Sequence, residues 1–165
     1  MIRNVRLTDS TALTAMYNHY IRTSGATFEE EEISEDEMRE RIQKIHLDKQ
    51  FPYIVFEEDG TILGYAYVTH FRDRISYRFT VESTVYLHPE HFGKGLGQVL
   101  YAELLSQTKA QGFHVVVGVI TLPNDSSVRL HEKFGFKKAG HFTEVGYKFE
   151  QWMDVGFWEL QLNEK

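Results

Sequence analysis

The chain has 165 residues, of which 42% are hydrophobic and 25% are charged, and these values suit one globular domain and exclude a disordered or fibrous protein. The net charge of -6 disfavours general attraction to nucleic acid or anionic lipid, and the absence of cysteine excludes disulfides, thiolate metal sites and cysteine nucleophiles. The N-terminus lacks the apolar run of a signal peptide, and no stretch of about 18 apolar residues occurs. We therefore expect a single cytoplasmic domain over residues 1–165. We expect neither nucleic acid nor a membrane as its partner.

The first half of the chain predicts a strand, two helices and a β-hairpin. Ser34, followed three residues later by Glu37, resembles a capping box at the start of a helix. A polar turn that contains Gly60 separates two apolar runs, which is typical of a hairpin. The elements expected here are a strand at residues 2–7, a helix that begins after the N-capping residues 8–10, a helix over residues 35–45, and strands over residues 53–56 and 62–68.

The second half predicts a central strand followed by alternating helices and strands. The segment of residues 77–87 is dense in β-branched and aromatic side chains and stops before Pro89, which cannot continue a strand. After a glycine-rich turn, the expected elements are a helix with its apolar face at Leu100, Leu104 and Leu105, a strand over residues 113–120, a helix over residues 124–134 and a last strand over residues 152–162. These elements predict an α/β (α+β) fold with a mixed, mostly antiparallel central sheet flanked by helices.

The glycine-rich turn within residues 88–98 (HPEHFGKGLGQ) carries the strongest chemical signal. Gly93, Gly95 and Gly97 let the backbone approach a ligand, so that several amides can converge on an anion at a helix N-terminus, and the natural guest is a phosphate. A Walker A loop needs a lysine and a hydroxyl after the loop, and a dinucleotide fingerprint needs a glycine where Gln98 stands, so neither motif fits. The alternative is a glycine-rich connection that binds no ligand.

Several short segments occur together in a fixed order along the chain. They are YRFTVESTVY at residues 77–86, GKGLG at 93–97, NDSS at 124–127, LH at 130–131, GF at 135–136, VGYKF at 145–149 and WMDVGFW at 152–158, with YN at 17–18 and ATFE at 26–29 near the N-terminus. Through these segments, residues 77–160 resemble the C-terminal part of the GNAT acetyltransferase superfamily, and specifically its phosphinothricin and methionine sulfoximine acetyltransferase branch. The chain departs from the branch at Phe92, where the superfamily usually has glutamine or arginine, and at Met153, where the branch has histidine.

The resemblance implies a GNAT fold, acetyl-CoA as cosubstrate without a metal, and transfer of acetyl to the α-amine of a small amino-acid-like molecule. Together with the aromatic C-terminal strand, it also implies a homodimer, and Trp152, Phe157 and Trp158 are expected in the core or the dimer interface. The implied cofactor-binding residues are Val85, Tyr86 and Leu87 on the strand, Gly93, Lys94, Gly95, Leu96, Gly97 and Gln98 in the turn, and Asn124 and Ser127 at the start of the next helix. For Asn124 the alternative role is a helix cap.

Glu82 is the leading candidate for a general base. It lies within an apolar strand, where an unpaired carboxylate is costly and its pKa tends to rise, so it can accept a proton from an ammonium group directly or through water. The alternative is a buried structural ion pair. By resemblance, His131 occupies the place of a tyrosine that protonates the departing thiolate, and its alternative is a histidine packed against the cofactor site.

Arg72 and Arg74 are the candidates for substrate recognition. In the resembling enzymes this loop recognises the substrate's carboxylate, which a guanidinium can bind through two hydrogen bonds, and the alternative is a solvated basic loop. His88 and His91 lack the helix and the third ligand of a metal site, so we assign no metal. Two other functions stay open: acetylation of a protein N-terminus, peptide or other amine, and a catalytically silent acetyl-CoA sensor.

Overall fold

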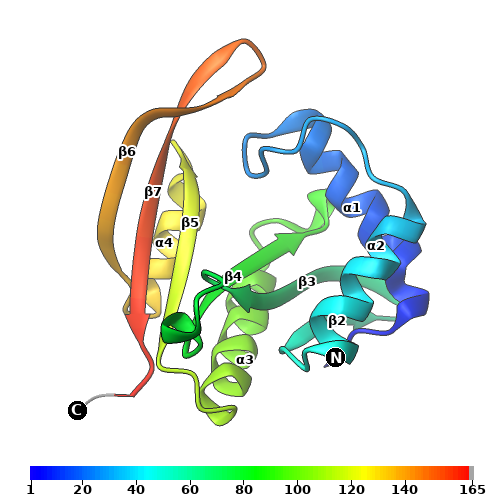
Figure 1. Cartoon of the computed structure of the whole chain (residues 1–165). Coiled ribbons are helices and arrows are strands. Elements are labelled where there is room, and N and C mark those ends of the chain that lie inside the picture. Colours follow the sequence, from blue (N-terminus) through cyan, green and yellow to red (C-terminus); the bar gives the residue numbers. More distant parts are fainter. Residues whose placement is uncertain (164–165) are drawn as a thin grey trace.

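The computed structural model describes residues 1–163, and all of its strands belong to one seven-stranded sheet (Figure 1). The order of the strands is β1-β2-β3-β4-β5-β7-β6. Only β4 and β5 pair in parallel, and every other neighbouring pair is antiparallel, which confirms the predicted mixed, mostly antiparallel sheet. The strands are β1 (Ile2–Asn4), β2 (Tyr53–Glu58), β3 (Thr61–His70), β4 (Thr80–Leu87), β5 (Val115–Leu122), β6 (Lys137–Lys148) and β7 (Gln151–Gln161).

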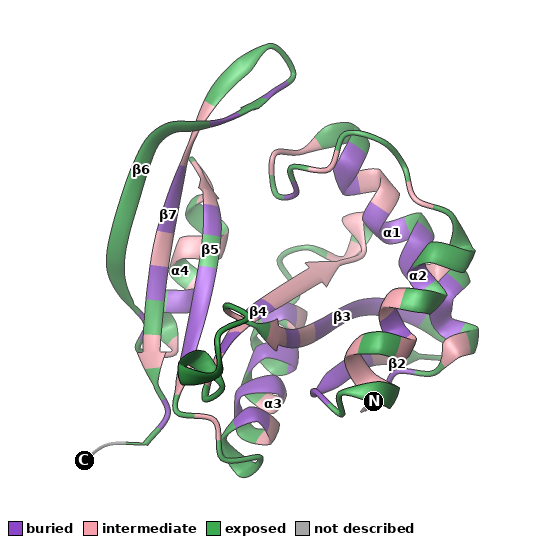
Figure 2. Cartoon of the chain, viewed as in Figure 1, coloured by how far each residue is buried: buried purple, intermediate pink, exposed green. Residues whose placement is uncertain are grey.

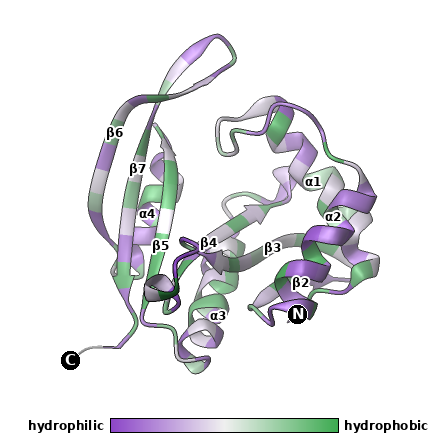
Figure 3. Ribbon diagram, viewed as in Figure 1, coloured by the Kyte–Doolittle hydropathy of each residue, from purple (hydrophilic) through white to green (hydrophobic). Residues whose placement is uncertain are grey.

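Within residues 1–163, four α-helices cover the two faces of the sheet. On one face, α1 (Ser10–Thr23) and α2 (Glu35–Ile42) enclose a cluster rich in tyrosine. On the other face lie α3 (Leu96–Ala110) and α4 (Asp125–Lys133). One side of α3 is buried (Figure 2), and its residues Leu100, Tyr101 and Leu104 are fully buried. The helix α2 is mostly hydrophilic (Figure 3), and its buried residues are Met38 and Ile42. No helix within residues 1–163 is long and apolar enough to cross a bilayer.

For most elements, the bounds predicted from local sequence patterns agree with the observed bounds to within a few residues. Ser34 accepts a hydrogen bond from the Glu37 amide at the start of α2, as the capping pattern predicts. The hairpin of β2 and β3 turns at Asp59 and Gly60, which both have positive φ angles, at 49° and 79°. In the first half of the chain, two boundaries differ from the prediction by three residues: β1 ends at Asn4, and α2 ends at Ile42 and continues as a π-helical segment, Gln43–Asp48.

The central strand is shorter than its composition predicts. It begins at Thr80, and Ile75–Tyr77 form a 3-10 turn that is closed by a hydrogen bond from the Arg78 amide to the Ile75 carbonyl. The cause is pairing: β3 ends at His70 beside Val81, and β5 begins at Val115 beside Thr80. Residues 77–79 have strand propensity but no neighbouring strand to pair with.

The strand β6 was not predicted at all. It is exposed along most of its length (Figure 2), and its pairing with β7 is interrupted between Lys138 and Gly140 and again between Phe142 and Gly146. These irregularities break the alternation of apolar and polar residues, so the sequence carries no regular strand signal there. In Figure 1, β6 and β7 form a long hairpin that extends beyond the sheet towards the loop after α1.

Candidate active site

The candidate site lies where the parallel strands β4 and β5 part. Their last paired residues are Ser83 and Gly118, although β4 continues to Leu87 and β5 to Leu122. A cavity of about 960 Å³ lies at this point, and we call it the cleft. Of the predicted residues, those that line the cleft are Glu82, Val85, Tyr86, Leu87, Gly93, Gly95, Leu96, Gly97, Gln98, Asn124, Ser127 and His131.

The glycine turn forms the end of the cleft at the N-terminus of α3. Gly93 and Gly95 have φ angles of +76° and +79°, and no atom lies within 4 Å of the position that a Cβ would take at either residue. Gly95 is the N-cap residue and provides no side chain, so the first amides of α3 remain available to a ligand. An open cradle of amides at a helix N-terminus fits a pyrophosphate. Acetyl-CoA, which contains one, therefore suits this end of the cleft.

Two basic side chains of α4, Arg129 and Lys133, also line the cleft near this turn. The Nζ of Lys133 donates to Oε1 of Gln98 over 2.9 Å, which joins α4 to the first turn of α3. Lys94, by contrast, is exposed, lies 3.3 Å from Nδ1 of His91 through its Nζ, and is not part of the cleft wall. The lysine and arginine side chains that line the cleft thus both come from α4, which the motif does not include.

Glu82 is half-buried and faces the side of the sheet that carries α1. Side chains alternate along β4, so Glu82 shares a face with Tyr86, whose ring centroid lies 5.0 Å from that of Tyr20 on α1. Ser83 points the other way, and its Oγ lies 2.7 Å from the Tyr101 hydroxyl on α3. Within residues 1–163 the Glu82 carboxylate has neither a hydrogen-bond partner nor an ion-pair partner, and burial raises its pKa.

His131 lies on the opposite face and is buried. Its Nδ1 donates to the Ser127 carbonyl over 2.7 Å, and its ring packs edge-on against Tyr101 and Phe136, with centroid distances of 5.1 Å and 5.0 Å. Burial lowers the pKa of the imidazole. The neutral ring therefore carries its proton on Nδ1 and leaves Nε2 as an acceptor.

The two other cofactor segments have partners within the chain. The Leu87 carbonyl accepts a hydrogen bond of 2.5 Å from the Tyr20 hydroxyl, while β4 after Ser83 has no pairing with β5. Oδ1 of Asn124 accepts from the Ser127 amide over 3.2 Å, so this residue is the N-cap of α4 and at the same time lines the cleft. The helix-cap role of Asn124 is thus present in the structure.

Arg72 and Arg74 are exposed and lie outside the cleft. They line a separate hollow of about 620 Å³ formed by the loop between β3 and β4. The guanidinium carbon of Arg72 lies 5.1 Å from the ring centroid of Phe71 and 5.8 Å from that of Tyr77. The structure therefore does not place these arginines beside Glu82 in one cavity.

The remaining residues considered in the sequence are the C-terminal tryptophans and the histidine pair after β4. Trp158 is buried in the core, whereas Trp152 is 65% exposed and packs against Tyr147 at a centroid distance of 4.7 Å. The rings of His88 and His91 lie edge to face, and across residues 1–163 no three His, Asp or Glu side chains gather in a way that could hold a metal ion.

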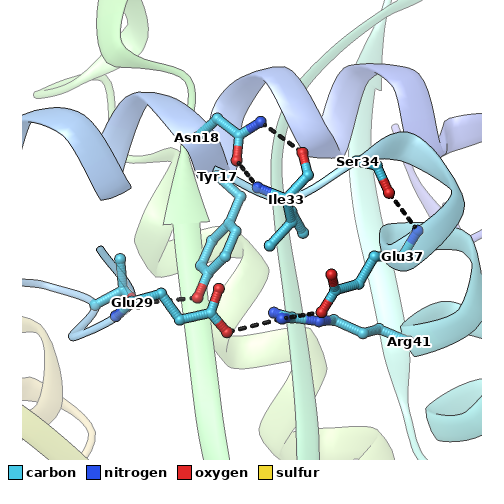
Figure 4. A network of polar contacts seen from close by, with 8 residues as sticks. Tyr17, Asn18, Glu29, Ile33, Ser34, Glu37 and Arg41 are labelled. Atoms are coloured by element: carbon cyan, nitrogen blue, oxygen red, sulfur yellow. Dashed lines mark hydrogen bonds and ion pairs between the residues drawn. The ribbon is translucent and has the colours of Figure 1, made fainter. Parts of the chain in front are cut away.

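The sequence interpretation missed one wall of the cleft. Ser24, Ala26, Thr27 and Phe28, in the loop after α1, line it. This segment includes the ATFE motif, but no periodicity or charge pattern assigns it a role. The Tyr17 hydroxyl lies 2.8 Å from Oγ1 of Thr27 and so anchors the loop to α1. Figure 4 shows the neighbouring polar contacts, which join Asn18 to Ile33 and Arg41 to both Glu29 and Glu37.

Comparison with known proteins agrees with this geometry. The family model of the acetyltransferase (GNAT) domain matches residues 2–156. A phosphinothricin N-acetyltransferase from Alcaligenes faecalis is 41% identical over 98% of this chain and 82% of its own length, and an L-methionine sulfoximine/L-methionine sulfone acetyltransferase from Salmonella typhimurium is 36% identical over 99% of this chain and 95% of its own.

A solved structure has the same fold with a cofactor bound. The crystal structure of a GNAT superfamily phosphinothricin acetyltransferase from Sinorhizobium meliloti in complex with acetyl-CoA superposes with a TM-score of 0.95 at 36% identity, and the match covers 99% of this chain and 88% of that one. The family match and this likeness extend over the cleft, the glycine turn and the sheet. The chain therefore belongs to the GNAT family of acetyltransferases.

Proposed function

We propose that this chain transfers the acetyl group of acetyl-CoA to the α-amine of a small amino-acid-like substrate of the phosphinothricin or methionine sulfoximine type. The observation that carries the proposal is the unpaired carboxylate of Glu82 in a cleft that ends at an open amide cradle. The names of the relatives support this substrate class. We further propose that residues 1–165 act as a single domain in the cytoplasm.

Acetyl-CoA supplies an activated thioester, and the residues of the chain provide the proton transfers around it. Glu82, whose pKa is raised by burial, accepts a proton from the substrate ammonium directly or through water. With acetyl-CoA bound, the free amine would form a C–N bond with the acetyl carbon while the C–S bond breaks. The nitrogen would release a further proton and the departing thiolate would take one up, which gives the amide and CoA. The backbone of Val85, Tyr86 and Leu87 would hold the pantetheine chain where β4 has no pairing with β5, and an amide there would stabilise the thioester oxygen.

His131 is our candidate for the proton donor to the departing thiolate. In the free protein its Nε2 is an acceptor, so this role requires that Nε2 first binds a proton. The packing role needs no such change, because the ring already fits between Tyr101 and Phe136. The two roles differ in their dependence on pH, since only the acid role is lost as the ring becomes neutral.

We propose that Arg72 and Arg74 attract and orient the substrate's carboxylate. The pairing of Thr69 with Glu82 and of His70 with Val81 puts the loop that follows β3 at the same end of β4 as the proposed base. A guanidinium can bind a carboxylate through two parallel hydrogen bonds. The separate hollow that these arginines line would then be an approach to the cleft rather than part of it.

We also propose that the protein is a homodimer and that the β6–β7 hairpin forms the contact. The hairpin exposes a row of large apolar side chains, and such a row marks an interaction surface. Its members are Phe142, Val145, Tyr147, Phe149 and Trp152. Sedimentation analysis of the wild type and of Trp152→Glu would test this proposal, because a dimer that uses the hairpin should dissociate in the variant.

An acetylation screen tests the main proposal. The purified protein is incubated with acetyl-CoA and a panel of phosphinothricin, methionine sulfoximine, free amino acids, their carboxamides and short peptides, and released thiol is measured. We expect turnover with free α-amino acids or their analogues and less with the carboxamides. Turnover only with peptides would assign the chain to N-terminal acetylation, and acetyl-CoA binding without turnover would identify a sensor.

A further inference from the structure

Lys148, at the end of β6, is a buried cation outside the machinery described above. Its side chain is 1% exposed, and its Nζ donates to the carbonyl oxygens of Ser24 and Thr27, each over 2.8 Å. The Nζ also lies 4.9 Å from the ring centroid of Phe149. Burial of a lysine is costly unless its donors are satisfied, so these two bonds fix where the side chain can lie.

Both acceptors belong to the loop after α1. Ser24 is the C-cap of α1, and its carbonyl and that of Thr27 lie on either side of the turn that redirects the chain towards α2. A cation at this point satisfies the Ser24 carbonyl, which the end of the helix leaves without an intrahelical partner, and interacts favourably with the helix dipole. Lys148 therefore ties the end of β6 to the end of α1, although more than 120 residues separate them in sequence.

Two close contacts hold the same loop against the hairpin. A Cβ at Gly146 would lie 2.3 Å from Cζ of Phe28, so the ring fits only because residue 146 is glycine. Similarly, a Cβ at Gly25 would lie 2.8 Å from Sδ of Met153. The loop is thus clamped by β6 and β7 on one side and by the network of Figure 4 on the other.

The clamped loop bounds the half of the cleft where the acceptor amine would bind. Ala26, Thr27 and Phe28 line the cleft, and the Ala26 carbonyl lies 3.4 Å from the hydroxyl of Tyr86, which shares the Glu82 face of β4. The residues of α4 and His131 lie on the opposite face. The loop consequently lies on the Glu82 face of β4, and within residues 1–163 no hydrogen bond joins it to the glycine turn or to α4.

We propose that Lys148 is a positioning residue that fixes the loop of residues 24–28 as the wall of the acceptor half of the cleft. This assignment rests on the proposed function, since it supposes that an amine acceptor binds beside Glu82. Lys148 contacts no reacting group and acts through the Ser24 and Thr27 carbonyls. Its loss should therefore weaken acceptor binding and leave acetyl-CoA binding intact.

The test compares Lys148→Met and Lys148→Arg with Lys137→Met as matched control, because Lys137 is an exposed lysine at the other end of the same strand. Three quantities are measured: hydrogen exchange of the amides of residues 24–28, the Kd of acetyl-CoA by calorimetry, and KM and kcat for the acceptor found in the screen. Loss of two hydrogen bonds from a charged donor should speed exchange and raise the acceptor KM about tenfold or more in Lys148→Met. Acetyl-CoA affinity should stay within about twofold, the arginine variant should partly restore KM, and the control should match the wild type.

Wild-type exchange and an unchanged acceptor KM in a folded Lys148→Met variant would overturn the assignment. If that variant does not fold, Gly146→Ala tests the loop through Phe28 instead: a raised acceptor KM at unchanged acetyl-CoA affinity supports the assignment, and wild-type constants oppose it. Should the wild type acetylate no amine, the proposed function fails. The exchange comparison still decides whether Lys148 orders the loop.

Discussion

The imidazole of His131 on α4 occupies the space that a side chain on β5 would fill at Gly118. A Cβ at Gly118 would lie 2.6 Å from both Cδ2 and Nε2 of the ring. Gly118 is also the last residue of β5 that pairs with β4. The histidine thus sits where the two strands begin to part, with its free nitrogen against the strand backbone.

Gly118→Ala should displace this ring and impair both stability and turnover. The added methyl group cannot coexist with the imidazole, which Tyr101 and Phe136 hold from the other side, so we expect a loss of about 1–3 kcal/mol in the free energy of unfolding. Urea denaturation and steady-state kinetics measure the two effects. Gly140→Ala is the control, because a Cβ there would lie 3.9 Å from the nearest atom of Phe157, an ordinary contact distance. Equal unfolding free energies and equal turnover in Gly118→Ala and Gly140→Ala would contradict the close packing of the His131 ring against Gly118.

Gly95→Val should abolish acetyl-CoA binding in a folded protein, because a β-branched side chain would block the approach of a phosphate to the amides. Both Gly95 and Gly60 have a φ of +79° with open space around the missing Cβ, so Gly60→Val carries the same backbone strain at the distant β2–β3 turn. Calorimetric titration should show loss of affinity only in Gly95→Val, while thermal unfolding should show similar destabilisation in both. Normal affinity in Gly95→Val would remove the turn from the cofactor site.

Glu82→Gln should retain the fold and cofactor affinity but lower kcat by about a hundred- to ten-thousandfold, since the amide keeps the shape and lacks the basicity. Wild-type activity should fall as the pH drops through an apparent pKa above the usual value of a glutamate, because burial raises that of Glu82. The variant should recover in part at high pH as free amine accumulates. Kinetics across pH decides the role: a higher KM with an unchanged kcat would mean that Glu82 only binds the ammonium.

Glu82→Gln should also make the protein more stable at neutral pH. Because the pKa of Glu82 is raised in the folded state, folding favours its protonated form, and that contribution to stability is present below the pKa of the unfolded chain and is lost as the pH rises through the folded pKa. A glutamine at this position does not ionise, so the variant does not lose this stability as the pH rises. Thermal unfolding should therefore give a higher Tm for the variant at pH 7 and no difference near pH 3. A lower Tm at pH 7 would indicate that the carboxylate has a stabilising partner.

Arg72→Ala and Arg74→Ala should raise the KM for a carboxylate-bearing acceptor more than the KM for its carboxamide. A hydrogen-bonded guanidinium stabilises a bound carboxylate by about 1.5–3 kcal/mol, which corresponds to a change of roughly ten- to a hundredfold in KM. A neutral carboxamide is stabilised less by the same guanidinium. Arg78→Ala serves as control, because Arg78 belongs to the same loop and stacks on Phe79 at 4.6 Å. Equal increases in KM for the two acceptors would mean that the two arginines have only a structural role in the loop.

The sequence by itself determined the features that depend on neighbouring residues. The helix start at Ser34, the turn at Gly60 and the amide cradle at Gly93 and Gly95 follow from short-range sterics and hydrogen bonds, which a few adjacent residues set. The alternation of β4 likewise fixes that Glu82 and Ser83 face opposite sides. These signals were enough to predict the fold class and the amide cradle at the start of α3, whereas the other predicted residues of the cleft came from the family resemblance.

The tertiary structure alone decided what depends on contacts between distant segments. Because the pairing of β6 with β7 is irregular, the sequence carries no regular strand pattern for β6. The start of β4 at Thr80 is set by the end of β3 and the beginning of β5 beside it. The position of Arg72 outside the cleft and the bond of Lys148 to the loop after α1 depend on how separate elements pack. Packing is set by the summed burial of many side chains across the sheet, and no local pattern of residues records which distant backbone a buried lysine will reach.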